Sequence, residues 1–119
     1  MVNRGKALVV DDCRDWREEL KDLLHDKGFE VVTAGDLGTA LSVLSNESFD
    51  TAIIDVNLTE GMPSEEGLLI NSYIQDNSPN TEVILISVKS LTDWRLGDIH
   101  PARFIEKSNL WTELNELLK

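Results

Sequence analysis

Three carboxylates, a hydroxyl and an ammonium stand at the ends of short apolar runs in this sequence. Asp11 and Asp12 follow one run, Asp55 and Ser87 end two others, and Lys107 follows a fourth. Carboxylates gathered at one place repel one another strongly, unless a hard divalent cation that prefers oxygen ligands lies among them, and Mg²⁺ is the natural occupant. A carboxylate beside Mg²⁺, with an ammonium and a hydroxyl opposite, can attack phosphorus while the cations neutralise the phosphoryl oxygens. The set suggests an aspartyl phosphate, with Asp55 as the first functional candidate.

The apolar runs that carry these groups are typical of buried strands in a parallel sheet, and helical stripes separate them. The predicted strands are Lys6 to Val10, Phe29 to Ala34, Thr51 to Asp55, Glu82 to Ser87 and Arg103 to Glu106. Five strands alternating with helices imply an α/β fold with one doubly wound parallel sheet and helices on both faces. Ligands in such folds bind beyond the carboxyl ends of the strands, which is the edge where all these polar groups fall.

Apolar residues at helical spacing predict the helices between the strands. The apolar stripes of the first three helices are Trp16, Leu20, Leu23 and Leu24; Leu37, Leu41 and Leu44; and Leu69, Ile70, Tyr73 and Ile74. The last helix should turn Trp111, Leu114, Leu117 and Leu118 inward. The expected N-caps are Asp36, Ser64, and Ser108 or Asn109. Between Ser90 and Arg103 the pattern predicts only a short or irregular helix, because Gly97 and Pro101 leave little room.

Each polar group also has an ordinary structural explanation. An aspartate pair before a helix often only caps it, a serine at a strand end closes a turn, and a lysine can be solvated. Any one of these explanations is plausible alone, but their coincidence at one edge of the sheet favours a site.

Composition narrows the class of protein. The 119 residues suit a single domain, and 22 acidic against 11 basic side chains give a net charge of −11, which opposes direct binding to nucleic acid. The longest apolar runs are too short to span a membrane or to form a signal peptide. The single cysteine, Cys13, fits a reducing compartment, and we expect it to pack near the start of a helix. These features together predict a cytoplasmic protein.

The sequence resembles the receiver domain of two-component response regulators over nearly its whole length. The resemblance rests on VVDDC at Val9 to Cys13, IIDVNL at Ile53 to Leu58, LIS at Leu85 to Ser87 and FIEK at Phe104 to Lys107. Four such motifs, in order and on the expected elements, make the match specific. The family implies a flavodoxin-like receiver fold with sheet order 2-1-3-4-5, so that residues 1–119 form one receiver domain.

The resemblance also implies a metal site built on the first and third strands. Asp55 looks like the phosphoacceptor, and Asp12 and Asp55 look like direct Mg²⁺ ligands. Asp11 would act on the metal through water, and Asn57 would offer its backbone carbonyl.

Ser87 and Lys107 would hold the phosphoryl group, by the same resemblance. Phe104 occupies the position of an aromatic switch residue, which turns inward as the hydroxyl of Ser87 is drawn toward the phosphoryl group; an ordinary apolar strand residue fits this position equally well. The family implies a histidine kinase or a phosphotransfer protein as phosphoryl donor. The receiver of the signal would be a downstream protein or an output domain beyond this sequence, with a homodimer as one option.

The sequence departs from the family pattern at three places. Ser108 stands where the family usually has a proline in a cis bond, the loop from Thr59 to Glu66 is longer than usual, and the fourth helix is weak. A non-proline cis bond costs about 3 kcal/mol, so we expect a trans bond after Lys107. The excess of large apolar residues between Ser90 and Arg103 suggests a protein-contact surface there, together with the neighbouring face of the last helix.

Two other functions remain open at this point. A degenerate receiver would bind partners without being phosphorylated, which Ser108 and the altered loop make plausible. A Mg²⁺-dependent phosphohydrolase would act on an outside substrate through the same aspartate, although the sequence offers no second general acid and no substrate pocket.

Overall fold

A computed structural model describes residues 4–56, 66–88 and 103–118 of the chain. The elements in chain order are β1 (Gly5–Val10), α1 (Arg14–Asp26), β2 (Phe29–Ala34), α2 (Leu37–Asn46), β3 (Thr51–Asp55), α3 (Glu66–Asn77), β4 (Glu82–Ser87), β5 (Arg103–Glu106), the 3-10 turn η2 (Lys107–Asn109) and α5 (Leu110–Leu117). The strands pair in the order β2-β1-β3-β4-β5, and every pair is parallel. The predicted fold class and strand order are therefore confirmed.

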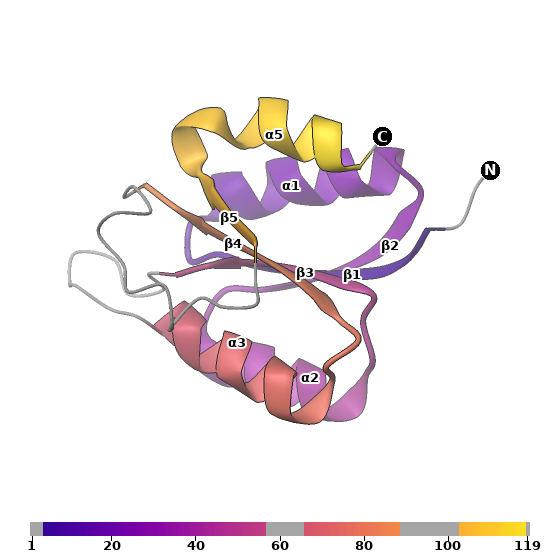
Figure 1. Cartoon of the computed structure of the whole chain (residues 1–119), viewed down its shortest axis with the longest axis vertical. Coiled ribbons are helices and arrows are strands. Elements are labelled where there is room, and N and C mark those ends of the chain that lie inside the picture. Colours follow the sequence, from indigo (N-terminus) through magenta and orange to yellow (C-terminus); the bar gives the residue numbers. More distant parts are fainter. Residues whose placement is uncertain (1–3, 57–65, 89–102, 119) are drawn as a thin grey trace.

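The sheet lies between two layers of helices, with α1 and α5 on one face and α2 and α3 on the other (Figure 1). In the central strands β1, β3 and β4 nearly every side chain is buried, since helices cover both faces. Alternate residues supply two separate cores. Leu8, Ile54 and Leu85 belong to the core under α2 and α3. Val9 and Ile53 belong to the core under α1 and α5.

The N-terminal ends of two helices test the predicted capping residues. The carboxylate of Asp36 accepts a hydrogen bond from the backbone N–H of Thr39 at 2.7 Å, as predicted for the N-cap of α2. Asn109 occupies the N-cap position of α5 without a side-chain bond, because the chain enters this helix through η2. The predicted capping by Asn109 is therefore wrong, and Ser108 lies inside η2. Ser64 lies outside the described residues.

Two predicted apolar stripes need correction. Leu69 of α3 is 59% exposed, and Leu68 is buried in its place. Trp111 of α5 is 37% exposed, while its neighbour Leu110 is fully buried. The other predicted residues do face the sheet: Ile70 and Ile74 of α3 and Leu114 and Leu118 of α5 are buried. Each predicted stripe is therefore confirmed except for one residue at its edge, which periodicity alone does not resolve.

No helix among the described residues is long and apolar enough to cross a membrane. The region from 89 to 102, where a weak helix and a contact surface were predicted, lies outside the described residues.

Candidate functional site

The register of the sheet brings the predicted site residues to one edge. Val10 pairs with Ile54 across β1 and β3, so Asp11 and Asp55, the next residue on each strand, reach the same level. Asp55 in turn pairs with Ile86 of β4, and Ser87 is one residue further along. Lys107 follows the last residue of β5. The parallel topology therefore collects groups that lie far apart in the sequence.

Three of these groups form a compact acidic cluster. One carboxylate oxygen from each of Asp11, Asp12 and Asp55 lies within 4.8 Å of the other two. Asp11 is fully buried, Asp55 is 5% exposed, and Asp12 is half-buried. Such proximity with so little water is unfavourable for three negative charges unless a cation balances them.

Lys107 supplies part of that balance. Its Nζ lies 2.9 Å from Asp11 Oδ2 and donates a hydrogen bond to Asp55 Oδ2 at 3.1 Å, and its side chain is only 8% exposed. Burial works to lower the pKa of Lys107, but the contacts with Asp11 and Asp55 outweigh burial and hold that pKa above the usual lysine value. The lysine is therefore a permanent cation at neutral pH, and the following Ser108 has not prevented it from reaching the site.

The cluster has the donors that a magnesium ion requires. Asp11 Oδ1 accepts a hydrogen bond from the backbone N–H of Cys13 at 2.9 Å. Asp11 Oδ2 is buried and has no hydrogen bond of good geometry from the residues that the structure describes, although Lys107 Nζ is at ion-pair distance from it. The ammonium therefore attracts this oxygen but leaves it able to accept a hydrogen bond from a further group. Three carboxylates and one ammonium leave a net double negative charge, so the residues present fit a hard divalent cation.

The backbone around the cluster is held closely. Arg17 Nη1 donates to the carbonyl of Asp11 at 2.8 Å, and the N–H of Gly67 donates to the carbonyl of Val56 at 2.8 Å. A Cβ on Gly67 would lie 2.2 Å from the carbonyl oxygen of Asp55. Glycine is therefore required where α3 begins, directly behind Asp55.

Cys13 is exposed, so its predicted packing role is wrong.

Lys107 lies against one tryptophan that stacks on a second, and the sequence interpretation assigned both to the core. The Nζ of Lys107 lies over the ring of Trp16, 4.8 Å from its centroid. The rings of Trp16 and Trp111 stack with centroids 5.7 Å apart and planes at 16°. The available signal was spacing: Trp16 follows Asp12 by four residues, and Trp111 follows Lys107 by four, which is about one helical turn.

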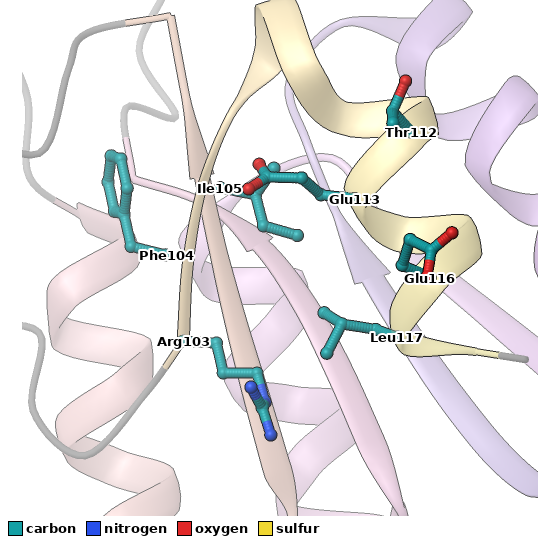
Figure 2. Close-up of a pocket in the computed structure, with 7 residues that line it drawn as sticks. All are labelled: Arg103, Phe104, Ile105, Thr112, Glu113, Glu116 and Leu117. Carbon is teal, nitrogen blue, oxygen red and sulfur yellow. The ribbon is translucent and has the colours of Figure 1, made fainter.

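Ser87 and Phe104 lie on neighbouring strands. Ser87 is 2% exposed, and Phe104 pairs in register with Leu85 of β4. Phe104 is half-buried against the core under α2 and α3. Figure 2 shows Phe104 and Ile105 on opposite sides of β5. Asn57 and most of the long loop lie outside the described residues, so the metal-ligand role of Asn57 stays a prediction.

An open groove of about 390 Å³ runs between β5 and α5 (Figure 2). Its lining is Arg103, Phe104, Ile105, Thr112, Glu113, Glu116 and Leu117. The groove is the described part of the surface on which a protein contact was predicted.

Comparison with known proteins gives a consistent result. The family model for the response regulator receiver domain matches residues 7–117. Response regulator protein PilR of Pseudomonas aeruginosa is 34% identical over 103 residues, which are 87% of this chain and 22% of PilR. Transcriptional regulatory protein CpxR of Escherichia coli is 32% identical over 93 residues, which are 78% of this chain and 38% of CpxR. The chain thus spans well under half the length of both relatives.

A solved structure extends this similarity to three dimensions. Response regulator protein TrrA from Thermotoga maritima, in complex with Mg²⁺-BeF, matches with a TM-score of 0.80 at 29% identity. The alignment covers 96% of each chain, and therefore includes the strands that carry the acidic cluster.

Proposed function

The chain belongs to the response regulator receiver domain family of two-component signalling, and from this premise we propose that Asp55 accepts a phosphoryl group in a Mg²⁺-dependent reaction. The observation that carries the proposal is the buried cluster of Asp11, Asp12 and Asp55, with the Lys107 ammonium bridging two of the three carboxylates. An ordinary structural ion pair does not need three carboxylates within 4.8 Å of one another.

In the proposed reaction a carboxylate oxygen of Asp55 attacks the phosphorus of the donor. A new O–P bond forms as the bond from phosphorus to the leaving group breaks, and the leaving group departs with the electron pair. Asp12, Asp55 and the carbonyl of Asn57, with Asp11 through water, are the groups that would hold Mg²⁺, and the bound ion would supply positive charge to the phosphoryl oxygens. Lys107 stays charged and would move from its present partners to a phosphoryl oxygen, where it offsets the added negative charge.

Ser87 and Phe104 are the proposed switch. Ser87 has the same strand parity as Leu85, so its side chain belongs to the face of the sheet on which Phe104 packs. A phosphoryl group on Asp55 would draw the Ser87 hydroxyl toward it. The hydroxyl would leave space on that face of the sheet, and the ring of Phe104 would move into this space.

The phosphoryl donor we propose is a histidine kinase or a phosphotransfer protein. The phosphorylated domain would then act on an output domain, on a downstream protein or on a second copy of itself. The groove beside β5 favours the second copy, because Arg103 and Glu113 both line it, and opposite charges on one surface can pair across a twofold axis. Arg103 would exchange for this its exposed ion pair with Glu82, at 3.5 Å, which is worth little. Light scattering with Mg²⁺ and beryllofluoride should show a dimer that charge reversal of Arg103 abolishes. A monomer in every state would exclude the second copy and leave an output domain or a downstream protein as the target.

Intact-mass measurement after incubation with acetyl phosphate tests the central step. One phosphoryl group should add, only when Mg²⁺ is present. Asp55→Asn should abolish the adduct, while Asp12→Ala should raise the Mg²⁺ concentration required. The matched control is Asp76→Asn, which changes an exposed carboxylate of α3 and should label as wild type does.

The same experiment separates the alternatives. Absence of the adduct at saturating Mg²⁺ would make the chain a degenerate receiver. Labelling that survives Asp55→Asn would refute the assignment of the acceptor. Sustained turnover of small phosphate esters would point to a phosphohydrolase.

A further inference from the structure

The ammonium of Lys107 has a third neighbour besides its two carboxylates. The ring of Trp16 lies beneath it, with Nζ 4.8 Å from the ring centroid. A lysine ammonium has three N–H donors, and here Asp11 Oδ2, Asp55 Oδ2 and the indole face lie around it. At 8% side-chain exposure the ammonium has lost most of its water, which makes an aromatic face a more effective substitute.

This contact matters because the two carboxylates hold only the tip of the lysine side chain, and both are also expected to serve a metal ion. Its four-carbon stem is flexible, and many rotamers are accessible to it. The next residue is Ser108, which is exposed and lacks the rigid ring of a proline. The position of the ammonium must therefore come from the groups that surround it.

Trp16 is itself well fixed. It is the third residue of α1, and it stacks on Trp111, the second residue of α5, with planes at 16°. Both helices cover the same face of the sheet (Figure 1). A half-buried indole supported by a second indole is a rigid surface, which a single exposed aromatic side chain would not provide.

We propose that Trp16 is a positioning residue for phosphorylation: its indole holds the Lys107 ammonium between Asp11 and Asp55, and Trp111 supports the indole. This inference rests on the proposed function for its effect on rate, but the positioning itself is independent of phosphorylation. The ammonium would turn from the two carboxylates to a phosphoryl oxygen while it stays over the ring, so the indole contact is kept as the reaction proceeds. Without the indole face the ammonium samples other positions, and the fraction of molecules ready to receive the phosphoryl group falls.

The test compares Trp16→Leu, Trp16→Phe and Trp111→Leu by two measurements. The first is the rate of labelling by acetyl phosphate with Mg²⁺. Trp16→Leu should slow it by about fivefold to thirtyfold, the range expected for loss of a desolvated cation–π contact. Trp16→Phe keeps an aromatic face and should recover most of this loss. Trp111→Leu removes a comparable amount of packing but leaves the face over the lysine, so its loss should be smaller.

The second measurement is the NMR signal of the Lys107 ε-methylene group, identified by its absence in Lys107→Met. In the wild type the ring should shift this signal and keep its two protons distinct. Trp16→Leu should bring the signal to the position of a mobile lysine, and Trp16→Phe should retain part of the shift. A purely structural role would alter stability in all three variants without this pattern.

Several outcomes would overturn the inference. Labelling of Trp16→Leu at the wild-type rate would do so, as would equal losses in the leucine and phenylalanine variants with an unchanged lysine signal. If the wild type gains no phosphoryl group, the proposed function falls, and the NMR measurement alone decides whether the indole holds the ammonium.

Discussion

Replacing Gly67 with alanine should damage both the fold and the site, because the start of α3 lies directly against the end of β3. The added Cβ would meet the carbonyl oxygen of Asp55 at 2.2 Å and the Cα of Val56 at 2.6 Å, whereas ordinary contact begins near 3.4 Å. Both neighbours are backbone atoms, so no side chain can rotate away. The helix or the strand end must move.

Overpacking of this kind costs about 1–3 kcal/mol, and the shortness of these contacts places Gly67→Ala toward the upper end. With a urea dependence of about 1–3 kcal/mol per molar, the unfolding midpoint should fall by roughly 1 M. Because the displaced atoms belong to Asp55 itself, labelling by acetyl phosphate should also slow. Urea unfolding followed by circular dichroism, together with intact-mass kinetics, measures both effects.

Gly38→Ala is the matched control, because Gly38 is also the second residue of its helix. It is exposed, and a Cβ there would meet only Asp36 Oδ1, at 3.6 Å. This substitution should leave labelling unchanged and raise stability by up to about 1 kcal/mol, because alanine loses less backbone entropy on folding. If both variants lose stability equally, or if Gly67→Ala unfolds at the wild-type midpoint, close packing of α3 behind Asp55 is not what that glycine provides.

The remaining predictions concern charge. Asp12→Asn should raise the stability of the fold in EDTA, because it relieves repulsion between the carboxylates. It should also weaken the stabilisation by Mg²⁺, which for the wild type is expected to reach about 2.7 kcal/mol at 100 times Kd. Thermal unfolding during a Mg²⁺ titration measures both effects. Lys107→Met should lower the free energy of unfolding by about 3–5 kcal/mol in EDTA, because two buried carboxylates lose their cation. Added Mg²⁺ should recover part of this loss. Equal stability with and without Mg²⁺ would contradict the prediction. The hydrogen bond from the backbone N–H of Thr39 lowers the pKa of Asp36 in the folded state. The ionised Asp36 therefore stabilises the fold above the pKa that it has in the unfolded chain, and this contribution is lost as pH falls through its pKa in the folded state. Asp36→Asn should therefore flatten the pH dependence of stability below about pH 4.

The strands and their common edge were accessible from the sequence for a physical reason. Buried parallel strands need apolar residues on both faces, so Thr51 to Asp55 and Glu82 to Ser87 stand out as runs, and their observed bounds match the predicted ones. Once the strands are parallel, topology alone brings Asp11, Asp55 and Lys107 together, whatever their sequence separation. The acidic cluster was predictable for the same reason.

The edges of the helix stripes were less accessible, because periodicity identifies the buried face of a helix but not which residues at its border stay exposed. Trp111 was expected inward and lies partly exposed, where it can stack on Trp16. Contacts between residues of two different helices depend on how both helices pack, and single-helix periodicity carries no information about that. Spacing could place Trp16 and Trp111 near the site residues, but the contact between Lys107 and Trp16 depends on helix packing and was outside the reach of periodicity.

The alternation of side chains along the strands limits how phosphorylation can be transmitted. Asp55 has the parity of Ile53, which belongs to the core under α1 and α5, and Lys107 lies over Trp16 of α1 on the same side of the sheet. Phe104 packs on the opposite face, under α2 and α3. Within the part of the chain that the structure describes, Ser87 combines the parity of Phe104 with a position at the site edge, because it ends the strand next to Asp55. A hydroxyl there can follow a new phosphoryl group around the end of the sheet, whereas a residue further inside β4 would be separated from it by the sheet itself.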